Sequence, residues 1–461
     1  MSSRQLFFLY MIVFSSLAGC ITSQPKPEDV QTGLLNEYPA TWTMETSQTP
    51  GSSPTDQITL TPIGSPSSTP EVVPPTPSQL NSGQPTQTPF SYRALPPLTS
   101  GKEINLTSIN MITSEKGWAI GSQGDGYQRI LFTRDGGYNW QDKTPSVLVP
   151  QGFIPRKDNI IAHFEDEKTA LILIDDTRDE LEDSNIVVWK TKDSGQTWSP
   201  STPLPFPSDW YYIFPGGFSF VNPDTGWLLV QTEFSHMHDF SYLFSTRDGG
   251  VNWKLVNQPG NSMIEVLRNT GMVFVNDTDG WVSKDEMGYE FGPFLEITHD
   301  AGITWENLSL PHPGDGSWQD SHQSCLTINP VFSSPQTGFI LVQCFMYDDV
   351  NHQFRMEDPD TFIYATSDWG ESWQITELPS RADQLLFTDL QTGFAMGRDH
   401  YKTINGGGDW IKIKSVTWDG QFSFINPEEG WTLARRDTQV ALLHTHDGGL
   451  TYQEITPIAI P

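Results

Sequence analysis

The chain is poor in cysteine, in basic residues and in long apolar runs. With 3 cysteines among 461 residues, it is not a small framework held together by disulfides. Its 26 Lys and Arg stand against 56 Asp and Glu, a formal net charge of −30, which argues against binding nucleic acid or anionic lipid headgroups. The apolar run Leu6–Leu17 near the N-terminus is too short to span a bilayer comfortably.

The first twenty residues have the order of a secretory signal. A short start containing Arg4 precedes the apolar run, and small residues lead into Leu17-Ala18-Gly19-Cys20. This ending resembles a bacterial lipobox, which implies a signal peptide over residues 1–19 and a lipid on Cys20. We therefore expect an extracytoplasmic, membrane-anchored lipoprotein at the cell surface or in the periplasm. The alternative is an ordinary signal peptide with a chance cysteine.

Residues 20–90 are rich in Pro, Ser and Thr and have few large apolar side chains. Such a segment buries too little surface to offset the entropy of ordering it. We expect a disordered tether that acts as a stalk.

An eight-residue motif, Ser/Thr-x-Asp-x-Gly-x-x-Trp, recurs from residue 133 onward, and we call it the box. Its third position is Asp135, Asp193, Asp248, Asp300, Asp368, Asn405 and Asp447, with Asn405 and the terminal Tyr452 marking two degenerate copies. The copies follow one another every 37 to 68 residues. A fixed motif at such intervals indicates a repeat architecture in which no single unit buries its apolar face alone.

A second motif, Gly followed by an aromatic residue, alternates with the box. It occurs at Gly117-Trp118, Gly226-Trp227, Gly280-Trp281, Gly338-Phe339, Gly393-Phe394 and Gly430-Trp431, with a degraded copy at Ala170-Leu171. Strand-like runs flank each copy, so each unit has four short strands, A to D. The fold is predicted to be all-β: a seven-bladed β-propeller of four-stranded antiparallel blades over residues 91–461. The blades are predicted near residues 104–143, 160–202, 217–257, 271–309, 325–377, 384–413 and 421–458.

The paired motifs resemble the BNR/Asp-box β-propellers, a repeat shared by sialidases, sortilin-type receptors and oligoxyloglucan hydrolases. The unit from Phe220 to Trp253 is also similar to the photosystem II stability/assembly factor-like family. The resemblance covers residues 104 to 458. It implies the propeller fold, and for the assembly-factor-like family a non-enzymatic scaffold that holds a membrane-protein partner. Because one propeller scaffold carries many unrelated activities, it specifies function poorly.

The box aspartates are interpreted as structural, because their carboxylates can accept backbone N–H bonds inside a tight hairpin. We therefore assign no catalytic, cofactor-binding or metal-binding residue and expect a non-enzyme rather than an enzyme. A sialidase would need three converging arginines, and Arg134 and Arg247 belong to box turns. A carbohydrate-active propeller, either a sialidase-like or an oligoxyloglucan hydrolase-like glycoside hydrolase, remains the alternative.

Strand alternation places the box turns and the Gly-aromatic turns on one face, the box face. The B–C and D–A connections lie on the opposite loop face, where most of the length variation falls. Our candidate binding residues there are Trp210, Tyr211, Tyr212, His236, His238 and Trp318. They predict a docking surface for a protein or glycan partner, used by a monomer without cofactor; the aromatic residues could instead cover the rim of the core.

Two further loop-face features have a plainer interpretation. His236 and His238, with His312 and His322 nearby, have plausible metal-ligand spacing, but a solvated loop is the favoured interpretation. The acidic runs 175–183 and 348–360 lack the spacing of a known calcium loop, so solvated charge is again favoured.

Cys325 and Cys344 are predicted to face each other across the A–B hairpin of the fifth blade. In an exported protein this arrangement indicates a disulfide, the alternative being two buried thiols.

Overall fold

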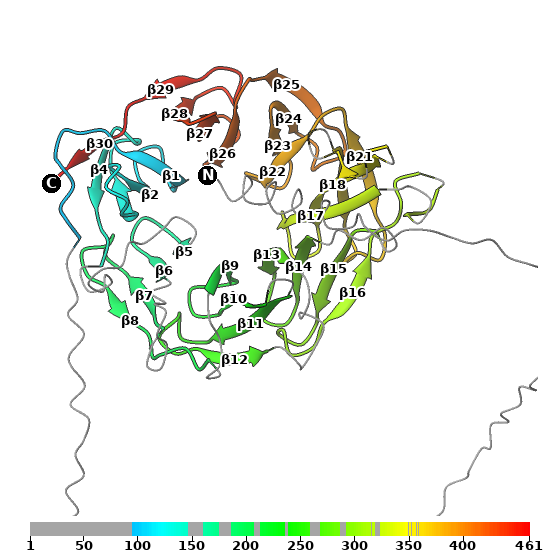
Figure 1. Cartoon of the computed structure of the whole chain (residues 1–461), viewed down its shortest axis with the longest axis horizontal. Helices are drawn as coiled ribbons and strands as arrows, with labels where there is room; N and C mark the ends of the chain where they lie inside the picture. Colours follow the sequence, from blue (N-terminus) through cyan, green and yellow to red (C-terminus); the bar gives the residue numbers. More distant parts are fainter. Residues whose placement is uncertain are drawn as a thin grey trace, which may run out of the picture. The chain divides into compact units, whose positions relative to one another are not determined.

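The computed structural model describes residues 95–145, 160–174, 186–206, 213–235, 238–258, 268–285, 292–314, 316–318, 323–348, 350–351, 353–355, 357 and 359–461. In this part of the chain, seven antiparallel sheets of four main strands stand around a ring (Figure 1). The predicted seven-bladed β-propeller is confirmed. The predicted signal peptide and tether lie outside the described residues, and no helix among the described residues is long and apolar enough to cross a membrane.

Each blade runs from an inner strand A to an outer strand D. The A strands are β1 (Asn105–Met111), β5 (Ile160–Phe164), β9 (Ile213–Phe220), β13 (Arg268–Phe274), β17 (Gln323–Phe332), β22 (Ala382–Phe387) and β26 (Asp419–Phe424). The B strands are β2 (Gly117–Ser122), β6 (Ala170–Ile174), β10 (Gly226–Ser235), β14 (Gly280–Asp285), β18 (Gly338–Asp348), β23 (Gly393–Gly397) and β27 (Gly430–Arg436). The C strands are β3 (Arg129–Thr133), β7 (Val188–Thr191), β11 (His238–Thr246), β15 (Phe294–Thr298), β20 (Asp360–Thr366), β24 (Asp399–Thr403) and β28 (Gln439–Thr445). The D strands are β4 (Asn139–Asp142), β8 (Ser199–Pro200), β12 (Lys254–Asn257), β16 (Glu306–Ser309), β21 (Gln374–Leu378), β25 (Ile411–Ser415) and β29 (Gln453–Ile455).

The paired residue on strand A lies directly over the glycine of the Gly-aromatic motif, which explains why this position is a glycine. In blade three Gly226 pairs with Phe220, and a Cβ on Gly226 would lie 2.5 Å from Phe220 Cδ1. The ring of Phe220 therefore occupies the space that any larger residue at 226 would need. The same crowding by the paired A-strand residue recurs at Gly117, Gly280, Gly338, Gly393 and Gly430.

The aromatic residue after that glycine packs against the next blade. Trp227 of blade three stacks on Phe274 of blade four, with ring centroids 3.7 Å apart and planes 3° from parallel. Equivalent contacts join Trp118 to Phe164, Trp281 to Phe332, Phe339 to Phe387 and Phe394 to Phe424. Each such pair contributes about 0.5–1.5 kcal/mol beyond its buried area. The blades are thus joined by a repeated aromatic contact.

The box is a hydrogen-bonded turn that uses both oxygens of its carboxylate. In blade one, Thr133 Oγ1 donates to Asp135 Oδ1 at 3.0 Å and accepts from Gly137 N at 3.1 Å. Asn139 donates its backbone N–H to Asp135 Oδ1 and its Nδ2 to Asp135 Oδ2, at 2.9 and 2.6 Å. Every one of the seven boxes repeats the first three of these bonds. The fourth bond, from the side chain before the terminal aromatic residue to Oδ2, recurs in five other boxes and is reversed in the sixth, so this side chain is also part of the motif.

Backbone bonds place the two kinds of turn on the same face. In blade three the box residue Gly249 donates its N–H to Asp224 O, in the A–B turn, at 2.8 Å. Five other blades have an equivalent bond: Gly136 to Glu115, Ser194 to Lys168, Ala301 to Thr278, Gly406 to Gln391 and Gly448 to Glu428. The predicted box face therefore exists, and the B–C connections lie at the other end of the strands.

The ring closes through a C-terminal strand that the sequence analysis did not predict. Blade seven has its own four strands, β26 to β29, as expected. The chain then continues to β30 (Ile458–Ile460), which pairs in parallel with β4 at the outer edge of blade one. Ala459 is fully buried there, and Figure 1 shows β30 beside β4 at the C-terminal end of the chain. Residues 91–94, whose part in this closure the sequence leaves open, lie outside the described residues.

Candidate functional site on the loop face

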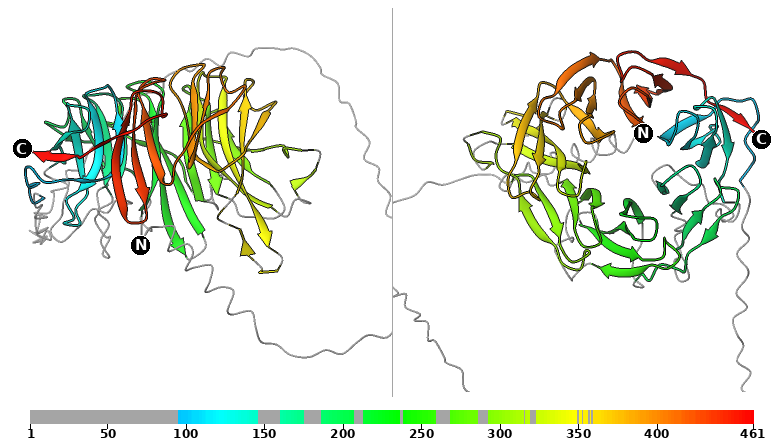
Figure 2. Two further views of the ribbon diagram at one scale, coloured as in Figure 1. Left: turned by 90° about the horizontal axis from the view of Figure 1, so that it is seen from above. Right: turned by 180° about the vertical axis from the view of Figure 1, so that it is seen from behind.

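Two blades project beyond the others on the loop face. In blade three, β10 has 10 residues and β11 has 9, and in blade five β18 has 11. The other B strands have five to seven. Beyond the main sheet of blade five, β18 also pairs with β19 (Gln353–Phe354). Green and yellow strands reach past the rest of the ring on one side in Figure 2, left. The loop face is therefore uneven, with blade four between two raised neighbours.

A buried ion pair lies at the loop-face end of blade four. Lys284 Nζ donates to Glu296 Oε1, and the two side chains are 2% and 1% exposed. Burial raises the pKa of Glu296 to about 6, against the opposing attraction of Lys284. The backbone of Lys284 both donates to and accepts from Thr327 Oγ1 of blade five. The pair is therefore part of the contact between blades four and five.

A disulfide joins the first two strands of blade five. Cys325 on β17 and Cys344 on β18 are direct partners in the strand register and are bonded to each other, with Cα atoms 4.0 Å apart. Close by, Gln323 Nε2 donates to Asp360 Oδ2 at 2.7 Å. The disulfide and this hydrogen bond together connect the A, B and C strands of blade five where its hairpin begins to project on the loop face.

Trp318 is the one candidate binding residue whose side chain the structure describes. Its indole N–H donates to Leu310 O at 2.9 Å, and its ring covers Gly292, where a Cβ would lie 2.4 Å from Trp318 Cδ1. His312 meets the ring edge-on, with centroids 4.7 Å apart. Trp318 is half-buried and held in place, so it can present a fixed aromatic surface beside blade four.

The other candidates are less fully described. Trp210, Tyr211, Tyr212 and His236 lie outside the described residues, and of His238 the structure gives the backbone, at the start of β11. Their role as a docking surface stays a prediction.

Asp348 belongs to one of the acidic runs considered for calcium, and its carboxylate is engaged in a turn. It accepts from Val350 N at 2.9 Å and from both nitrogens of Asn351 at 3.2 and 2.9 Å. These hydrogen bonds, that from the Asn351 side chain first, lower the pKa of Asp348. The other run, residues 175–183, lies outside the described part of the chain.

The hydrogen bonds of the box turns occupy the box carboxylates. Hydrogen bonds from Ser372 and Thr366 hold the pKa of Asp368 at about 2. Asp193 likewise has a lowered pKa, through the side chain and backbone of Thr197. A carboxylate kept ionised and fully bonded serves neither as general acid nor as proton acceptor. The structural interpretation of these residues agrees with every box hydrogen bond described above.

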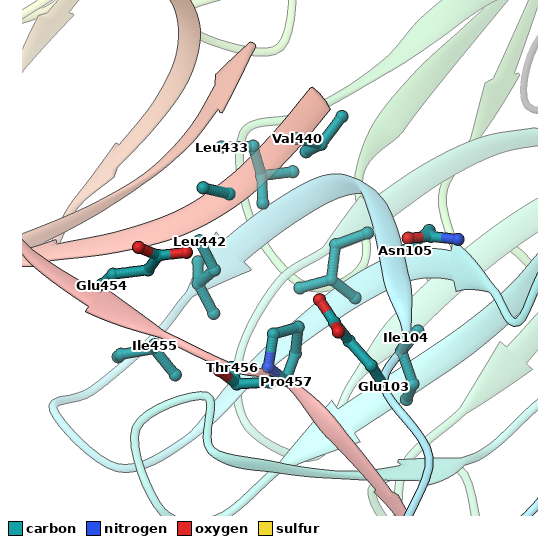
Figure 3. A pocket seen from close by; sticks show the side chains of 12 residues that line it. Glu103, Ile104, Asn105, Leu433, Val440, Leu442, Glu454, Ile455, Thr456 and Pro457 are labelled. Carbon is teal, nitrogen blue, oxygen red and sulfur yellow. The ribbon is translucent and has the colours of Figure 1, made fainter. Parts of the chain in front are cut away.

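A small pocket opens at the seam between blades seven and one. Aliphatic side chains, among them Leu433 and Leu442, line it together with two exposed acids, Glu103 and Glu454. Figure 3 shows Glu103 and Glu454 on either side of Leu442. The backbone next to Glu103 takes part in ring closure, since Ile104 N donates to Pro457 O at 2.9 Å. The pocket follows from the closure of the ring.

One cluster of potential metal ligands was not predicted from the sequence. Glu429, His444 and His446 of blade seven come together on the box face, with potential ligand atoms all within 4.8 Å of one another. His444 and His446 follow Glu429 by 15 and 17 positions in the chain. They lie close to Glu429 because the A–B turn adjoins the end of strand C. Aligning the two motifs of blade seven, Glu before Gly-Trp and His on both sides of the box Thr, could have found them.

No family model and no curated protein matches the chain. Solved structures do. YCF48 bound to D1 peptide is 14% identical, covering 78% of this chain and 99% of that one at a TM-score of 0.44. The polysaccharide lyase Uly1 is 9% identical, with 79% and 94% covered and a TM-score of 0.49. An α-L-arabinofuranosidase of Fusarium graminearum with arabinobiose is 10% identical, with 62% and 92% covered and a TM-score of 0.41. These likenesses concern the fold.

Proposed function

We propose that this chain is a non-catalytic binding scaffold that receives a protein or glycan partner on its loop face, over blades three to five. The observation that carries the proposal is the uneven loop face: the hairpins of blades three and five extend past blade four. Scaffold strands of five residues suffice for a blade here, as β23 shows. The extra length therefore builds a surface beyond what the ring needs.

The base of this surface is stiff, which suits recognition. The Cys325–Cys344 disulfide and the buried Lys284–Glu296 pair hold blades four and five, and Trp318 is fixed over Gly292. A preorganised surface loses less conformational entropy on binding than a mobile one, and fixed aromatic side chains are frequent anchors in interfaces.

The carboxyl groups of the described residues favour binding over catalysis. Burial raises the pKa of two of them, Glu165 and Glu296. Glu165 lies in the A–B turn of blade two on the box face, whereas Glu296 is buried at the opposite end of blade four. Glycoside hydrolysis needs two carboxyl groups flanking one bond, about 5–9.5 Å apart. Glu296 alone resembles a general acid and would support the carbohydrate-active alternative, but its side chain is 1% exposed.

A binding assay with face-specific variants tests the proposal. The full-length protein is immobilised and exposed to envelope proteins and to a glycan array. Trp210→Ala/Tyr211→Ala should abolish capture with little change in thermal stability. The matched control is Tyr138→Ala, which removes a half-exposed aromatic residue from the box face and should leave capture intact.

Two results would contradict the proposal. In the first, Trp210→Ala/Tyr211→Ala and Tyr138→Ala lose the partner equally, which would show that the loop face is not the specific binding site. In the second, the purified protein turns over a glycoside and a single change, Glu296→Gln, abolishes turnover while the protein stays folded. That outcome would establish the carbohydrate-active alternative.

We further infer that the scaffold is held at a membrane by a lipid on Cys20, since Leu17-Ala18-Gly19-Cys20 provides the modification sequence. One acyl chain gives weak membrane binding and several give stable anchoring. Cys20→Ala should leave the protein unprocessed or released from membranes. If this variant still enters the detergent phase after its signal is cleaved, the anchor lies elsewhere.

A further inference from the structure

The Glu429–His444–His446 cluster is the most concentrated set of potential metal ligands among the described residues. Glu429 ends the A–B turn of blade seven, His444 lies on β28, and His446 follows the box threonine. Glu429 Oε1 is 3.2 Å from His444 Nε2 and 3.7 Å from His446 Nδ1. Three side chains, from the A–B turn, from β28 and from the box turn of one blade, thus come close together.

Two of the three ligands are held in place. The ring of His444 stacks on Trp431, with centroids 4.1 Å apart and planes 13° from parallel. Trp431 is itself fixed by its indole N–H, which donates to Gly136 O of blade one at 2.9 Å. The turn of Glu429 is closed by Asn426, whose Oδ1 accepts from Glu429 N at 2.8 Å.

The third ligand can adjust. The side chain of His446 is 66% exposed, against 10% for His444 and 19% for Glu429. Its ring centroid is 4.0 Å from that of His444. His446 can therefore rotate toward a bound ion without disturbing the core.

The atom separations suit a small divalent ion. Ligands bound at about 2.0–2.1 Å in tetrahedral geometry lie roughly 3.3 Å apart. The Glu429–His444 separation of 3.2 Å already matches. The distance from Glu429 to His446 is 3.7 Å and the two imidazole nitrogens lie within 4.8 Å of each other, so the exposed ring of His446 must move toward the other two ligands. Two imidazoles with one carboxylate are typical ligands of zinc and of neighbouring transition metals, whereas calcium and magnesium prefer oxygen.

We propose that Glu429, His444 and His446 bind one divalent transition-metal ion of the zinc type on the box face. Glu429 supplies Oε1, His444 supplies Nε2 and His446 supplies Nδ1. The fourth position faces solvent, open to water or to a side chain from another molecule. The site lies at the opposite end of the strands from the proposed docking surface and is independent of it.

The repeat contains its own control. In blade four, Asp279 and His299 occupy the positions of Glu429 and His446, and their side chains are 2.6 Å apart. At the position of His444, however, blade four has Ile297, which pairs with Trp281 just as His444 pairs with Trp431. Blade four therefore has a histidine–carboxylate pair without the buried third ligand.

The comparison separates a metal site from a simple hydrogen bond. A hydrogen bond between a carboxylate and a histidine needs only two residues, and blade four has both of them in Asp279 and His299. His444 adds an imidazole beside Trp431, where blade four packs an aliphatic side chain. His444→Ile converts the seventh blade into the arrangement of the fourth, so the variant should fold.

The test is calorimetric titration of the metal-free full-length protein with Zn²⁺, together with the visible spectrum of Co²⁺ bound in its place. Wild type should bind one Zn²⁺ at this site and show the absorption of low-coordinate Co²⁺. His444→Ile and His446→Asn should each weaken Zn²⁺ at least about 100-fold, because even loss of a second-shell partner costs about 10–100-fold. His299→Asn, in blade four, should bind as wild type does.

Other outcomes overturn the proposal. Absence of Zn²⁺ binding to wild type does so directly. So does binding that survives both His444→Ile and His446→Asn, or binding that is instead lost with His236→Asn/His238→Asn on the loop face. Because His446 is exposed, its variant remains informative even if His444→Ile is unstable.

Discussion

The sixth box offers a test of the whole motif, because two of its side chains have exchanged roles. In the first box, Asn139 Nδ2 donates to Asp135 Oδ2. In the sixth, Asn405 takes the aspartate position and donates its Nδ2 to Asp409 Oδ2 at 2.8 Å. The bond is kept with donor and acceptor reversed. We predict that Asn405→Asp alone destabilises the protein and that Asp409→Asn added to it restores stability.

The magnitude follows from the geometry. Asn405→Asp sets two carboxylates about 2.8 Å apart, a repulsion of about 1.5 kcal/mol in water, and removes a hydrogen bond with a net value of about 1 kcal/mol. Relaxation of these exposed side chains reduces the sum, so we expect a loss of about 1–2 kcal/mol. Asp409→Asn alone should cost less, because an amide pair can still bond. The double variant should lie within about 0.5 kcal/mol of wild type, giving a coupling of about 1–2 kcal/mol.

Urea unfolding of the four proteins at pH 7, in low and in high salt, measures this coupling. The cost of Asn405→Asp should shrink at high salt, because exposed charges are screened. Thr403 Oγ1 and Asp409 N both bond to Oδ1 of residue 405, an atom that aspartate also provides, so the turn itself should persist. A double variant as unstable as the single, or a single variant without effect, would refute the reciprocal-bond account of the box.

Further predictions concern packing, pH and closure. Gly226→Ala should cost about 1–3 kcal/mol in urea unfolding, since its Cβ would meet Phe220, while Gly217→Ala, with open space around it, should be nearly neutral. Burial lowers the pKa of His163 and His400 to about 4, so the unfolded chain binds protons near pH 6.5 that the folded chain refuses. Stability should therefore be full above pH 6.5 and fall between pH 6.5 and 4, by up to about 3 kcal/mol for each histidine, as urea midpoints across that range would show. Ala459→Asp should cost at least about 2 kcal/mol by thermal unfolding, because it puts a charge into the buried closure strand.

The sequence could predict the blades because each one repeats two motifs with a local physical cause. The box can be recognised from eight consecutive residues, and the Gly-aromatic pair marks the start of each B strand. Cys325 and Cys344 could be paired because the A–B hairpin fixes which residues face each other. The physical cause of the Gly-aromatic motif comes from the structure: the glycine leaves room for the ring of its cross-strand partner, as at Gly226, and the aromatic residue packs on the next blade.

The closure and the blade-seven cluster could not be read in the same way. β30 is three residues long and pairs with a strand more than 300 residues earlier, so no local pattern announces it. Glu429 and His444 become neighbours through the register of one sheet. Of the predicted docking residues, Trp318 is described, and its anchoring to Leu310 O depends on a loop whose course sequence spacing does not determine.

Departures from the repeat are the best guide to function in this chain. A side chain that six equivalent positions do without is not needed to build a blade. By this reasoning the box aspartates belong to the scaffold, whereas the long hairpin of blade three and the disulfide of blade five do not follow from the repeat. His444 is such a departure, because no other blade has a histidine at its register position; the residues there are Phe132, Lys190, Ser245, Ile297, Ala365 and Lys402. An imidazole at this position is therefore not needed to build a blade, and Zn²⁺ titration of His444→Ile against His299→Asn decides whether it serves as a metal ligand.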